Sequence, residues 1–498
     1  MTGTVAGVLV DLARTHGERE AIVDGPVRLD YATLASRAAT AAGRLREQGV
    51  APGDRVAILL PNSWGYVIGY FGIQLAGAVA VLVNTRFTAS EIEHVLTDSG
   101  ARIVLTDAAS APLVTGATVV DVGSVVVGGP ESVDPGHLPG LRRRGADVAQ
   151  LLYTSGTTGQ PKGAMQTHAN LLFNARTVAE LLGAAPGERT LIAAPLFHAT
   201  GVASQLIGFL VAGACCVLMP AFRGDAALRL LVDERITVFG GVAAMLRLML
   251  TVPGVADADL SALRLFVMGG APVPASFPAD IAALLPKLVL GNVWGLTEAT
   301  SIVTYTAAED YLARPWSVGR AVRGVEIGIS LDGAPPADLR DVAGELCIRG
   351  PLVTAGYWAN PRATAATYVE GWLHTGDVGS VDAQGYVRVL DRLKDMIIRG
   401  GENIYSLELE TALATHPDIA DVAVVGVPDP IFDERVRAVV VPRPGAVLTV
   451  DSVRAHAATL LADYKVPAEV RFVTELPRNP AGKVLKQRLA EESDDLAG

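Results

Sequence analysis

The chain has 498 residues, of which 50% are hydrophobic and 19% charged, and its formal net charge is −11. This length predicts at least two domains, and the composition is that of a globular protein and not of a disordered chain. The acidic balance argues against nucleic acid partners and against anionic membranes, although an anionic small molecule needs only local positive charge.

The three cysteines, Cys215, Cys216 and Cys347, show no spacing typical of zinc ligands. The N-terminal segment has no basic stretch followed by an apolar core, so the sequence predicts no signal peptide. We therefore expect a cytoplasmic protein, in a reducing compartment.

Two uncharged stretches, residues 62–85 and 199–222, have the length of membrane spans. Each contains several glycines and the pattern AGAxxVL, at residues 76–82 and 212–218. This pattern predicts a helix that stops at a glycine and is followed by a short strand. We expect two buried helix–strand units and no integral membrane span.

Short apolar runs alternate with helical stretches along most of the chain. Strands are expected at 55–60, 101–105, 149–153, 190–194, 237–239, 263–268 and 287–290, and helices at positions such as 168–182 and 225–234. This alternation predicts the α/β class with parallel-rich sheets. Because ligands bind at the carboxyl ends of parallel strands, the loops after Tyr153, Met268 and Leu290 are expected to converge on one crevice.

The loop from Tyr153 to Gly163, with the sequence YTSGTTGQPKG, follows one of these strands directly. Its glycines let backbone N–H groups approach a ligand and its hydroxyls add donors, which suits a polyphosphate. The loop is not a Walker A motif, because Pro161 precedes Lys162 and a glycine follows it. The alternative is a flexible surface turn, which a loop of this regularity after a buried strand disfavours.

The pattern changes after Trp372. A hairpin with its turn at 382–385 leads to the charged break DRLKD at 391–395, and then to expected helices at 406–416 and 451–463 and strands at 422–427, 435–441 and 470–473. This order predicts a compact α+β domain. We place the boundary at about Asp391, which gives a large N-terminal α/β domain over 1–391 and a small, mobile C-terminal α+β domain over 392–498.

Further motifs follow in order along the chain: PLFH at 195–198, GGAP at 269–272, WGLTE at 294–298, GELCIRG at 344–350, TGD at 375–377, DRLKD at 391–395, GGENI at 400–404 and PAGK at 480–483. Together with the loop at 153–163 they resemble the adenylate-forming enzymes, which include acyl- and aryl-CoA synthetases, luciferases and the adenylation domains of peptide synthetases. The resemblance runs from about Tyr31 to Leu489.

The resemblance implies an AMP-forming acid–thiol ligase. A carboxylate attacks the α-phosphate of ATP to give an acyl-adenylate and pyrophosphate, and a thiol, usually that of coenzyme A, then displaces AMP. The small C-terminal domain of this family swings between the two steps. ATP, Mg²⁺ and coenzyme A are the implied cofactors and co-substrates.

The resemblance also assigns residues to ATP and AMP. The phosphates are expected to be held by Thr154, Ser155, Gly156, Thr157, Thr158, Gly159 and Lys162. The adenine is expected beside Gly269, Gly270, Ala271, Trp294 and Gly295. Trp294 stands where the family commonly has tyrosine, so we expect it to stack on the base without a hydroxyl contact.

Other positions match the family's metal, ribose and catalytic residues. Glu298 corresponds to the Mg²⁺ ligand, with Thr297 beside it on the phosphates, and one carboxylate plus phosphate oxygens suits this ion. Asp377 is expected to accept hydrogen bonds from the ribose hydroxyls, and Arg392 to lie near the ribose and the α-phosphate. Lys483 is expected to neutralise the carboxylate and the α-phosphate oxygens as they meet.

Two more family positions lie in the C-terminal region. Lys394 falls at the hinge, where the family has Asp or Lys and where the backbone dihedral angles change as the domain rotates. Gly400 and Gly401 match the loop that lines the tunnel for the pantetheine arm of coenzyme A, through which only small residues let a thin chain pass.

The residue after Phe197 bears on the acid. Peptide-synthetase domains that load α-amino acids usually have Asp at this position. This chain has His198, which disfavours amino acids as substrates. By its resemblance to the acyl- and aryl-CoA ligases, the side chain of His198 is expected near the substrate carboxylate. The acid pocket is expected to draw on His198, Thr200, Gly201, Gly241, Val242, Ala243, Gly270, Gly295, Leu296, Thr300, Ser301 and Ile302. None of these is Lys or Arg, so a second carboxylate would lie unpaired at a high desolvation cost. We expect an uncharged-tail monocarboxylate, either a medium-chain fatty acid or an aromatic acid.

Several alternatives stay open from the sequence. An enzyme that loads a carrier-protein thiol in place of coenzyme A shares every motif above, and a luciferase-like oxygenase has no supporting feature. A non-catalytic nucleotide-binding protein would have lost a catalytic residue. This chain keeps the expected residue at each of the family's catalytic positions, namely Lys162, Glu298, Asp377, Arg392 and Lys483. A nicotinamide dehydrogenase is excluded because the chain contains no GxGxxG. The oligomeric state is open between a monomer and a homodimer.

Overall fold

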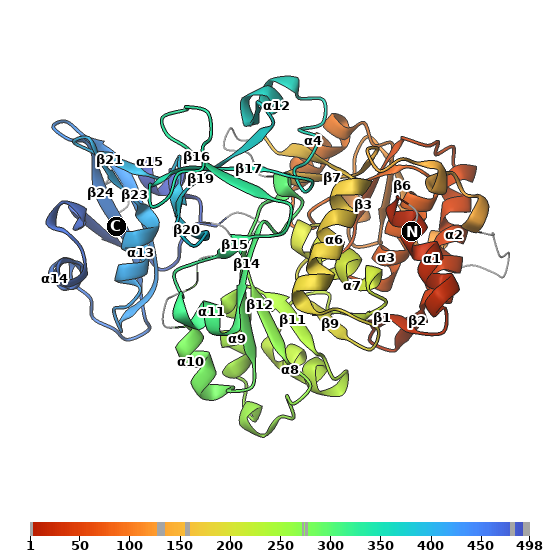
Figure 1. The fold of residues 1–498 in the computed structure, drawn as a ribbon, viewed down its shortest axis with the longest axis horizontal. Coiled ribbons are helices and arrows are strands. Elements are labelled where there is room, and N and C mark those ends of the chain that lie inside the picture. Colours follow the sequence, from red (N-terminus) through yellow and green to blue (C-terminus); the bar gives the residue numbers. More distant parts are fainter. Residues whose placement is uncertain are drawn as a thin grey trace. The chain divides into compact units, whose positions relative to one another are not determined.

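The computed structural model describes residues 3–126, 135–154, 160–270, 273, 277–478 and 484–491. The chain forms two compact units (Figure 1). Unit 1 comprises Met1–Ile327, Ile348–His374 and Gly385–Val387, and unit 2 comprises Gly328–Cys347, Thr375–Gln384 and Arg388–Gly498. The predicted boundary at about Asp391 falls inside the last segment of unit 2, and the division into 1–391 and 392–498 stays a prediction.

Unit 1 contains a six-stranded sheet in the order β6 (Thr118–Asp121), β5 (Ile103–Thr106), β3 (Arg55–Leu59), β4 (Val79–Leu82), β7 (Val148–Thr154) and β8 (Lys162–Thr167). The pairings from β6 to β7 are parallel, and β8 runs antiparallel to β7. The central strands are continuous apolar runs, as expected for a parallel sheet covered on both faces. The helices that pack with this part of unit 1 include α2 (Tyr31–Glu47), α3 (Trp64–Leu75) and α4 (Ala89–Ser99).

The second sheet of unit 1 has the order β15 (Gly319–Ala321), β14 (Thr304–Ala307), β13 (Val289–Trp294), β12 (Leu265–Met268), β11 (Val238–Gly241), β9 (Arg189–Ile192), β10 (Cys215–Leu218), β1 (Glu20–Asp24) and β2 (Val27–Asp30). The pairings from β13 to β1 are parallel. The sequence placed the end of β13 too early, because pairing with the antiparallel strand β14 extends it as far as Trp294. The expected α/β class with parallel-rich sheets is confirmed.

Helices of unit 1 begin and end close to the predicted residues. The helix α6 spans His168–Leu182 as predicted, and α8 spans Gly224–Asp233. The remaining α-helices described in unit 1 are α1 (Val5–His16), α5 (Val122–Val126), α7 (Gly208–Val211), α9 (Ala243–Leu250), α10 (Phe277–Leu284), α11 (Ala308–Ala313) and α12 (Pro361–Thr367).

The two uncharged stretches form helix–strand units as predicted. The helix α3 is followed by Gly77 with a φ of 76°, and α7 by Gly213 with a φ of 73°, which are left-handed conformations that favour glycine. The strands β4 and β10 come next, and both are buried. Among the described residues, no helix is both long and apolar enough to cross a membrane. The sequence did not predict that Thr200–Ile207 forms a π-helix, η4, ahead of α7.

Unit 2 contains most of the strands β16 (Glu326–Ser330), β17 (Gly344–Arg349), β19 (Trp372–Val381) and β20 (Tyr386–Arg392), which neighbour one another in this order. The short strand β18 (Tyr368–Val369) of unit 1 pairs with the start of β19. The predicted turn at 382–385 does connect β19 and β20.

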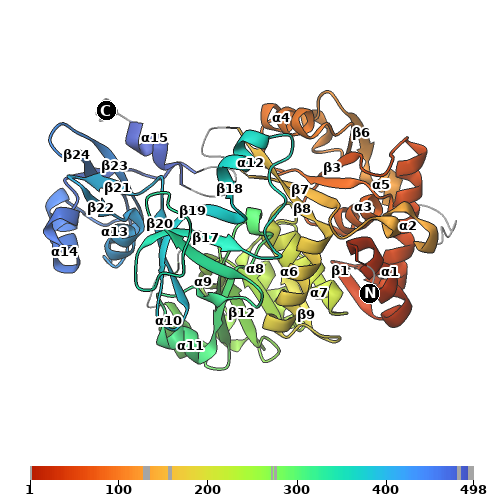
Figure 2. The same ribbon diagram turned by 45° about the horizontal axis from the view of Figure 1, so that its top comes forward.

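The C-terminal part of unit 2 has a five-stranded sheet. Its order is β22 (Glu402–Ile404), β21 (Ile397–Arg399), β24 (Asp433–Pro442) and β23 (Ile419–Asp429), and β25 (Glu469–Phe472) pairs with β24. The helices α13 (Ser406–Leu413) and α14 (Val450–Leu460) share an apolar core with one face of this sheet, and α15 (Lys486–Glu491) packs on the other face (Figure 2). The expected smaller α+β domain is confirmed.

His168 connects two helices of unit 1 and makes its stability depend on pH. The side chain is 2% exposed, and its Nδ1 accepts a hydrogen bond from the backbone N–H of Val5 at 3.3 Å. Burial, together with the positive charge of Arg143, lowers the pKa of His168 from 6.5 to about 4. The unfolded chain therefore binds a proton at a higher pH than the folded chain, so this contribution is complete above pH 6.5 and is lost as the pH falls towards 4.

We expect the free energy of unfolding to fall by about 2 kcal/mol between pH 7.5 and pH 5 through His168 alone. In His168→Asn the amide oxygen can still accept from Val5, but the side chain does not titrate. Denaturant unfolding of both proteins at the two pH values measures the difference. An equal loss of stability in the two proteins would show that His168 is not responsible.

Candidate functional site

The strands β7 and β8 bring the two ends of the predicted phosphate loop together. Thr154 at the end of β7 pairs with Lys162 at the start of β8. Residues 155–159, between the two strands, lie outside the described residues. They are the predicted phosphate ligands Ser155, Gly156, Thr157, Thr158 and Gly159. Their roles therefore stay predictions.

Glu298 lies beside this strand pair. Its Oε1 accepts a hydrogen bond from the hydroxyl of Tyr357 at 2.9 Å and a longer one from the hydroxyl of Thr154 at 3.4 Å. The Nζ of Lys162 lies 5.5 Å from the centre of the Tyr357 ring. Thr154, Lys162 and Glu298, which belong to two separate sequence motifs, thus lie together near Tyr357.

Tyr357 had no predicted role. Its position is set by long-range backbone hydrogen bonds, from Met165 to the carbonyl of Gly356 and from Trp358 to that of Gly163, so no local pattern could have indicated it. Burial raises the pKa of the Tyr357 hydroxyl, and the charge of Glu298 raises it further. The side chain therefore stays protonated and donates to Glu298.

A chain of buried amides holds the segment around Thr297 against β7 and β8. The Nε2 of Gln166 donates to the carbonyl of Thr297 at 2.9 Å, and the Nε2 of Gln150 donates to the Oε1 of Gln166 at 2.7 Å. The hydroxyl of Tyr70 donates to Gln150 at 2.7 Å. Both glutamines are fully buried, and this chain fixes the backbone just before Glu298.

The predicted adenine residues lie at the ends of two neighbouring strands. Gly270 follows β12, Ala271 lies outside the described residues, and Trp294 is the last residue of β13 with 7% of its surface exposed. A side chain on Gly295 would place its Cβ 1.5 Å from the backbone oxygen of Ser301, so only glycine fits there. The contact of Trp294 with a base stays a prediction.

The loop that carries His198 is anchored by two buried polar residues that the sequence did not single out. The Oδ1 of Asn62 accepts from the N–H of Leu196 at 2.8 Å, and its Nδ2 donates to the carbonyl of Ala194 at 3.0 Å. The hydroxyl of Tyr66 donates to the carbonyl of Leu196 at 3.0 Å. The rings of Phe197 and His198 lie 4.8 Å apart, and the side chain of His198 is half-buried.

The predicted acid-pocket residues lie on the elements that follow these strands. Gly201 lies in the π-helix η4, Val242 precedes α9, Leu296 precedes the short helix η6 (Thr297–Ala299), and Ser301 follows it. The hydroxyl of Ser204 in η4 donates to the hydroxyl of Ser301 at 2.8 Å, and both are buried. Ser204 was missed because nothing in the sequence indicated a π-helix, a form often found at functional sites.

In unit 2, Asp377 and Arg392 lie side by side, and their roles at the nucleotide stay predictions. The Nε of Arg392 is 2.7 Å from the Oδ1 of Asp377, whose side chain is 9% exposed. The N–H of Leu393 donates to the carbonyl of Gly376 at 2.8 Å, which holds β20 against this segment. Glu345 was not predicted here, and its carboxylate accepts from the N–H of Gly376 at 2.9 Å.

The predicted hinge and tunnel residues follow β20. Lys394 is exposed in a turn, in which the N–H groups of Asp395 and Met396 both donate to the carbonyl of Arg392. Gly400 and Gly401 connect β21 and β22 with φ angles of 59° and 86°. Lys483 lies outside the described residues. Neither the hinge role nor the tunnel role is tested by this geometry, and both stay predictions.

The donor set around Glu298 fits a magnesium ion. Two hydroxyl groups donate to the Glu298 carboxylate and orient it, and a carboxylate oxygen is a ligand that this hard cation prefers. The three cysteines are buried and form no disulfide. Burial raises the thiol pKa of Cys215 and Cys347 to about 12, which keeps both thiols protonated and makes them poor nucleophiles.

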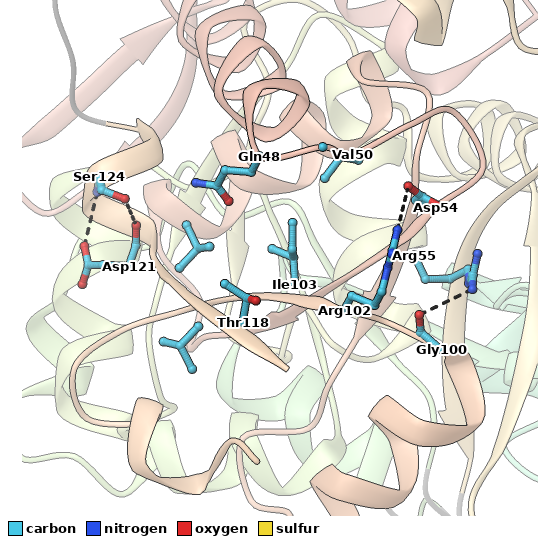
Figure 3. A pocket seen from close by; sticks show the side chains of 13 residues that line it. Gln48, Val50, Asp54, Arg55, Gly100, Arg102, Ile103, Thr118, Asp121 and Ser124 are labelled. Carbon is cyan, nitrogen blue, oxygen red and sulfur yellow. Dashed lines mark hydrogen bonds and ion pairs between the residues drawn. The ribbon is translucent and has the colours of Figure 1, made fainter. Parts of the chain in front are cut away.

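A cavity of about 720 Å³ in unit 1 lies away from these residues (Figure 3). It is found where β3 and β5 begin, and Arg102 pairs there with Asp54 at 3.7 Å. None of the predicted site residues lines it. Because ligands of parallel sheets bind at the carboxyl ends of strands, we do not assign the nucleotide to this cavity.

Comparison with known families decides the class of the protein. The model for AMP-binding enzymes matches residues 9–358, and the model for the AMP-binding enzyme C-terminal domain matches residues 408–483. The chain belongs to the AMP-binding enzymes. Its resemblance to the adenylate-forming enzymes is thereby confirmed, including the expectation that it is an enzyme.

Three curated relatives of this AMP-binding enzyme are ligases. A feruloyl-CoA synthase of Amycolatopsis is 40% identical, over 95% of this chain and 96% of the relative. The long-chain-fatty-acid–CoA ligase FadD13 of Mycobacterium tuberculosis is 35% identical, over 94% and 93%. The fatty acid–[acyl-carrier-protein] ligase ScoC of Streptomyces coeruleorubidus is 35% identical, over 97% and 96%. The expectation of an AMP-forming ligase is confirmed, whereas the acids of the relatives differ.

Two solved structures of a CoA synthetase are similar to this chain over nearly its full length. O-succinylbenzoate CoA synthetase (MenE) from Bacillus subtilis in complex with its acyl-adenylate intermediate is 30% identical, with a TM-score of 0.89 and coverage of 98% of both chains. The same enzyme in complex with ATP and a magnesium ion has a TM-score of 0.87, over 97% of this chain and 98% of that one.

Proposed function

We propose that this AMP-binding enzyme joins an uncharged-tail monocarboxylic acid to coenzyme A in two steps. The carboxylate oxygen attacks the α-phosphorus of ATP, and the bond to pyrophosphate breaks to leave an acyl-adenylate. The sulfur of coenzyme A then attacks the acyl carbon, and AMP leaves. The observation that carries this proposal is the grouping of Lys162, Glu298 and Thr154, from two separate motifs, at the end of one strand pair.

In unit 1 the polar residues would bind the phosphates and the metal. Lys162 would supply positive charge, and the ionised Glu298 would hold Mg²⁺, which would neutralise phosphate charge when bound. Tyr357 and Thr154 would orient the Glu298 carboxylate through the hydrogen bonds seen in the structure. Such preorganised charge is the main source of rate acceleration at phosphorus.

In unit 2 the Asp377–Arg392 pair would bind the nucleoside part. One carboxylate oxygen of Asp377 is bonded to Arg392, and an ionised carboxylate can accept further hydrogen bonds from ribose hydroxyls. Arg392 would direct its remaining guanidinium donors to the α-phosphate. Lys483 is proposed for the same step on its family position alone.

The tail of the acid would lie along η4. Ser301 is one of the predicted pocket residues, and its buried hydroxyl pair with Ser204 favours an aromatic acid that carries a ring oxygen over a saturated chain. The 40% identity to a feruloyl-CoA synthase supports the same choice. A medium-chain fatty acid is the second candidate, because most of the other predicted pocket residues are small and none is Lys or Arg.

An acyl carrier protein is the alternative acceptor. The 35% identity to a fatty acid–[acyl-carrier-protein] ligase favours it, and coenzyme A is favoured by the other two relatives. A phosphopantetheinyl thiol is the reacting group in both cases. We place the reaction in the cytoplasm, where ATP and coenzyme A are available, with the enzyme as a monomer or homodimer.

ATP-dependent pyrophosphate release over a panel of acids tests the proposal. Ferulate, cinnamate, octanoate and malonate are compared, each with coenzyme A, with a phosphopantetheinylated carrier protein and with neither acceptor. We expect ferulate to give the highest kcat/KM, with thioester formed on coenzyme A. Octanoate as the best substrate would contradict the aromatic assignment, and malonate as the best would contradict an uncharged tail.

Lys394→Pro tests the hinge. Proline fixes φ near −65° and removes a donor, so it should block a rotation about this residue. We expect the variant to release pyrophosphate at close to the normal rate in a single turnover, but to form thioester at least about 10-fold more slowly. Lys394→Ala is the matched control and should transfer normally. Normal thioester turnover in the proline variant would refute the hinge role.

A further inference from the structure

A buried polar cluster in unit 2 joins residues on both sides of the predicted hinge. Asp391 is the last residue but one of β20, ahead of Lys394, and is 5% exposed, whereas Ser406 begins α13 beyond it and is fully buried. The backbone N–H of Ser406 donates to one carboxylate oxygen of Asp391, and the Ser406 hydroxyl donates to the other at 3.1 Å. The Asp391 carboxylate therefore caps α13 from the other side of the hinge.

Lys486 supplies the positive charge of this cluster. Its Nζ lies 2.7 Å from the Oε1 of Glu410 and donates to the hydroxyl of Ser406. Burial raises the pKa of both Asp391 and Glu410, and the charge of Lys486 lowers both. One ammonium group thus compensates two buried acids, and its removal would leave their charge uncompensated.

The cluster reaches the proposed nucleotide residues through the backbone. The N–H of Arg392 donates to the Oδ1 of Asp391 at 2.7 Å, and the Nε of Arg392 lies 2.7 Å from Asp377. Arg392 is therefore tied through its backbone N–H to a carboxylate that Ser406 holds, and the hydroxyl of Ser406 is in turn held by Lys486.

We propose that Lys486 is a positioning residue for adenylation, which holds the Asp391 carboxylate on Ser406 and thereby orients Arg392 beside Asp377. This inference rests on the proposed function, which assigns Arg392 and Asp377 to the nucleotide. Glu410 is the second anchor of Lys486, and its Oε1 also accepts from the N–H of Val424 on β23 at 2.9 Å.

Kinetics of Lys486→Met test the inference by pyrophosphate exchange with the best acid of the panel. We expect the KM for ATP to rise at least about 10-fold, the size of one lost charge-assisted contact, with kcat changed much less. Lys486→Arg should restore the KM to within about 3-fold of wild type, since it keeps the charge. Arg488→Met removes an exposed cation of the same helix, α15, and should leave the KM unchanged.

A double-mutant cycle shows whether Lys486 acts through Asp391. Asp391→Asn can still accept from Arg392, but its NH₂ group cannot accept from the N–H of Ser406. We expect the KM for ATP of the double variant Asp391→Asn/Lys486→Met to equal that of the single variant with the higher KM, because both changes break one chain of contacts. If the fold-increase in KM of the double variant equalled the product of the fold-increases in the two single variants, the proposal would be overturned.

Folding and function are separated by a second variant. If Lys486→Met does not fold, Lys486→Met/Glu410→Gln removes one buried negative charge together with the positive one, and its KM for ATP should still be raised. A normal KM in either folded variant would overturn the role of Lys486. A wild-type enzyme that adenylates no acid would instead contradict the proposed function, and this inference with it.

Discussion

Lys483→Ala should reduce acyl-adenylate formation by at least about 100-fold, the scale for loss of one preorganised charge contact at a reacting centre. The carboxylate and the α-phosphate are both anionic, so their approach requires a cation, and the family position of Lys483 supplies one. In the transfer of the acyl group from a preformed acyl-adenylate to coenzyme A, the sulfur attacks the acyl carbon, so no second anion has to approach the phosphorus. We therefore expect that half-reaction to fall by less than about 3-fold.

Both half-reactions are measured on the same protein preparation, by pyrophosphate exchange and by thioester formation from synthetic acyl-adenylate. Arg488→Ala is the matched control, because Arg488 is an exposed cation close by in sequence and has no assigned role. An equal loss in the two half-reactions of Lys483→Ala would show that the lysine does not act in adenylation specifically.

Glu298→Gln should have the second largest effect. The substitution keeps an oxygen that can accept from Tyr357, but it removes the charge proposed to hold Mg²⁺. We expect adenylation to fall at least about 100-fold at low Mg²⁺, and the Mg²⁺ concentration for half-maximal rate to rise. Initial rates of pyrophosphate release over a Mg²⁺ titration measure both changes.

Tyr357→Phe provides the control for Glu298. It removes the 2.9 Å hydrogen bond to the carboxylate and leaves the charge in place. A loss of about 10-fold or less is expected, since one neutral donor orients the carboxylate but does not hold the metal. If Glu298→Gln kept the wild-type Mg²⁺ dependence, Glu298 would not be the metal ligand.

The elements of the fold were largely predictable, because local patterns determine them. The helix at His168–Leu182 follows from its apolar periodicity, and the glycine-stopped corners at Gly77 and Gly213 follow from a repeated seven-residue pattern. The π-helix at Thr200–Ile207 was not predictable, since its composition does not differ from that of an α-helix.

The residues that support the site were much harder to predict than its motifs. Glycine-rich and charged motifs carry their chemistry in their own sequence, whereas Tyr357 and Asn62 act through contacts with residues far away in the chain. Asp391 was recognised as the domain boundary and as part of the DRLKD motif, but its bond to Ser406 was not, because that bond depends on how β20 meets α13. Such roles become visible only once the chain is folded.

The products formed from ATP test the central claim most directly. Purified enzyme is incubated with ATP, Mg²⁺ and its best acid, without a thiol acceptor, and the nucleotides and phosphates are separated. The account predicts two products, pyrophosphate and an acyl-adenylate with the mixed-anhydride bond, and then AMP and thioester once coenzyme A is added. Formation of ADP and orthophosphate with no acyl-adenylate would contradict it.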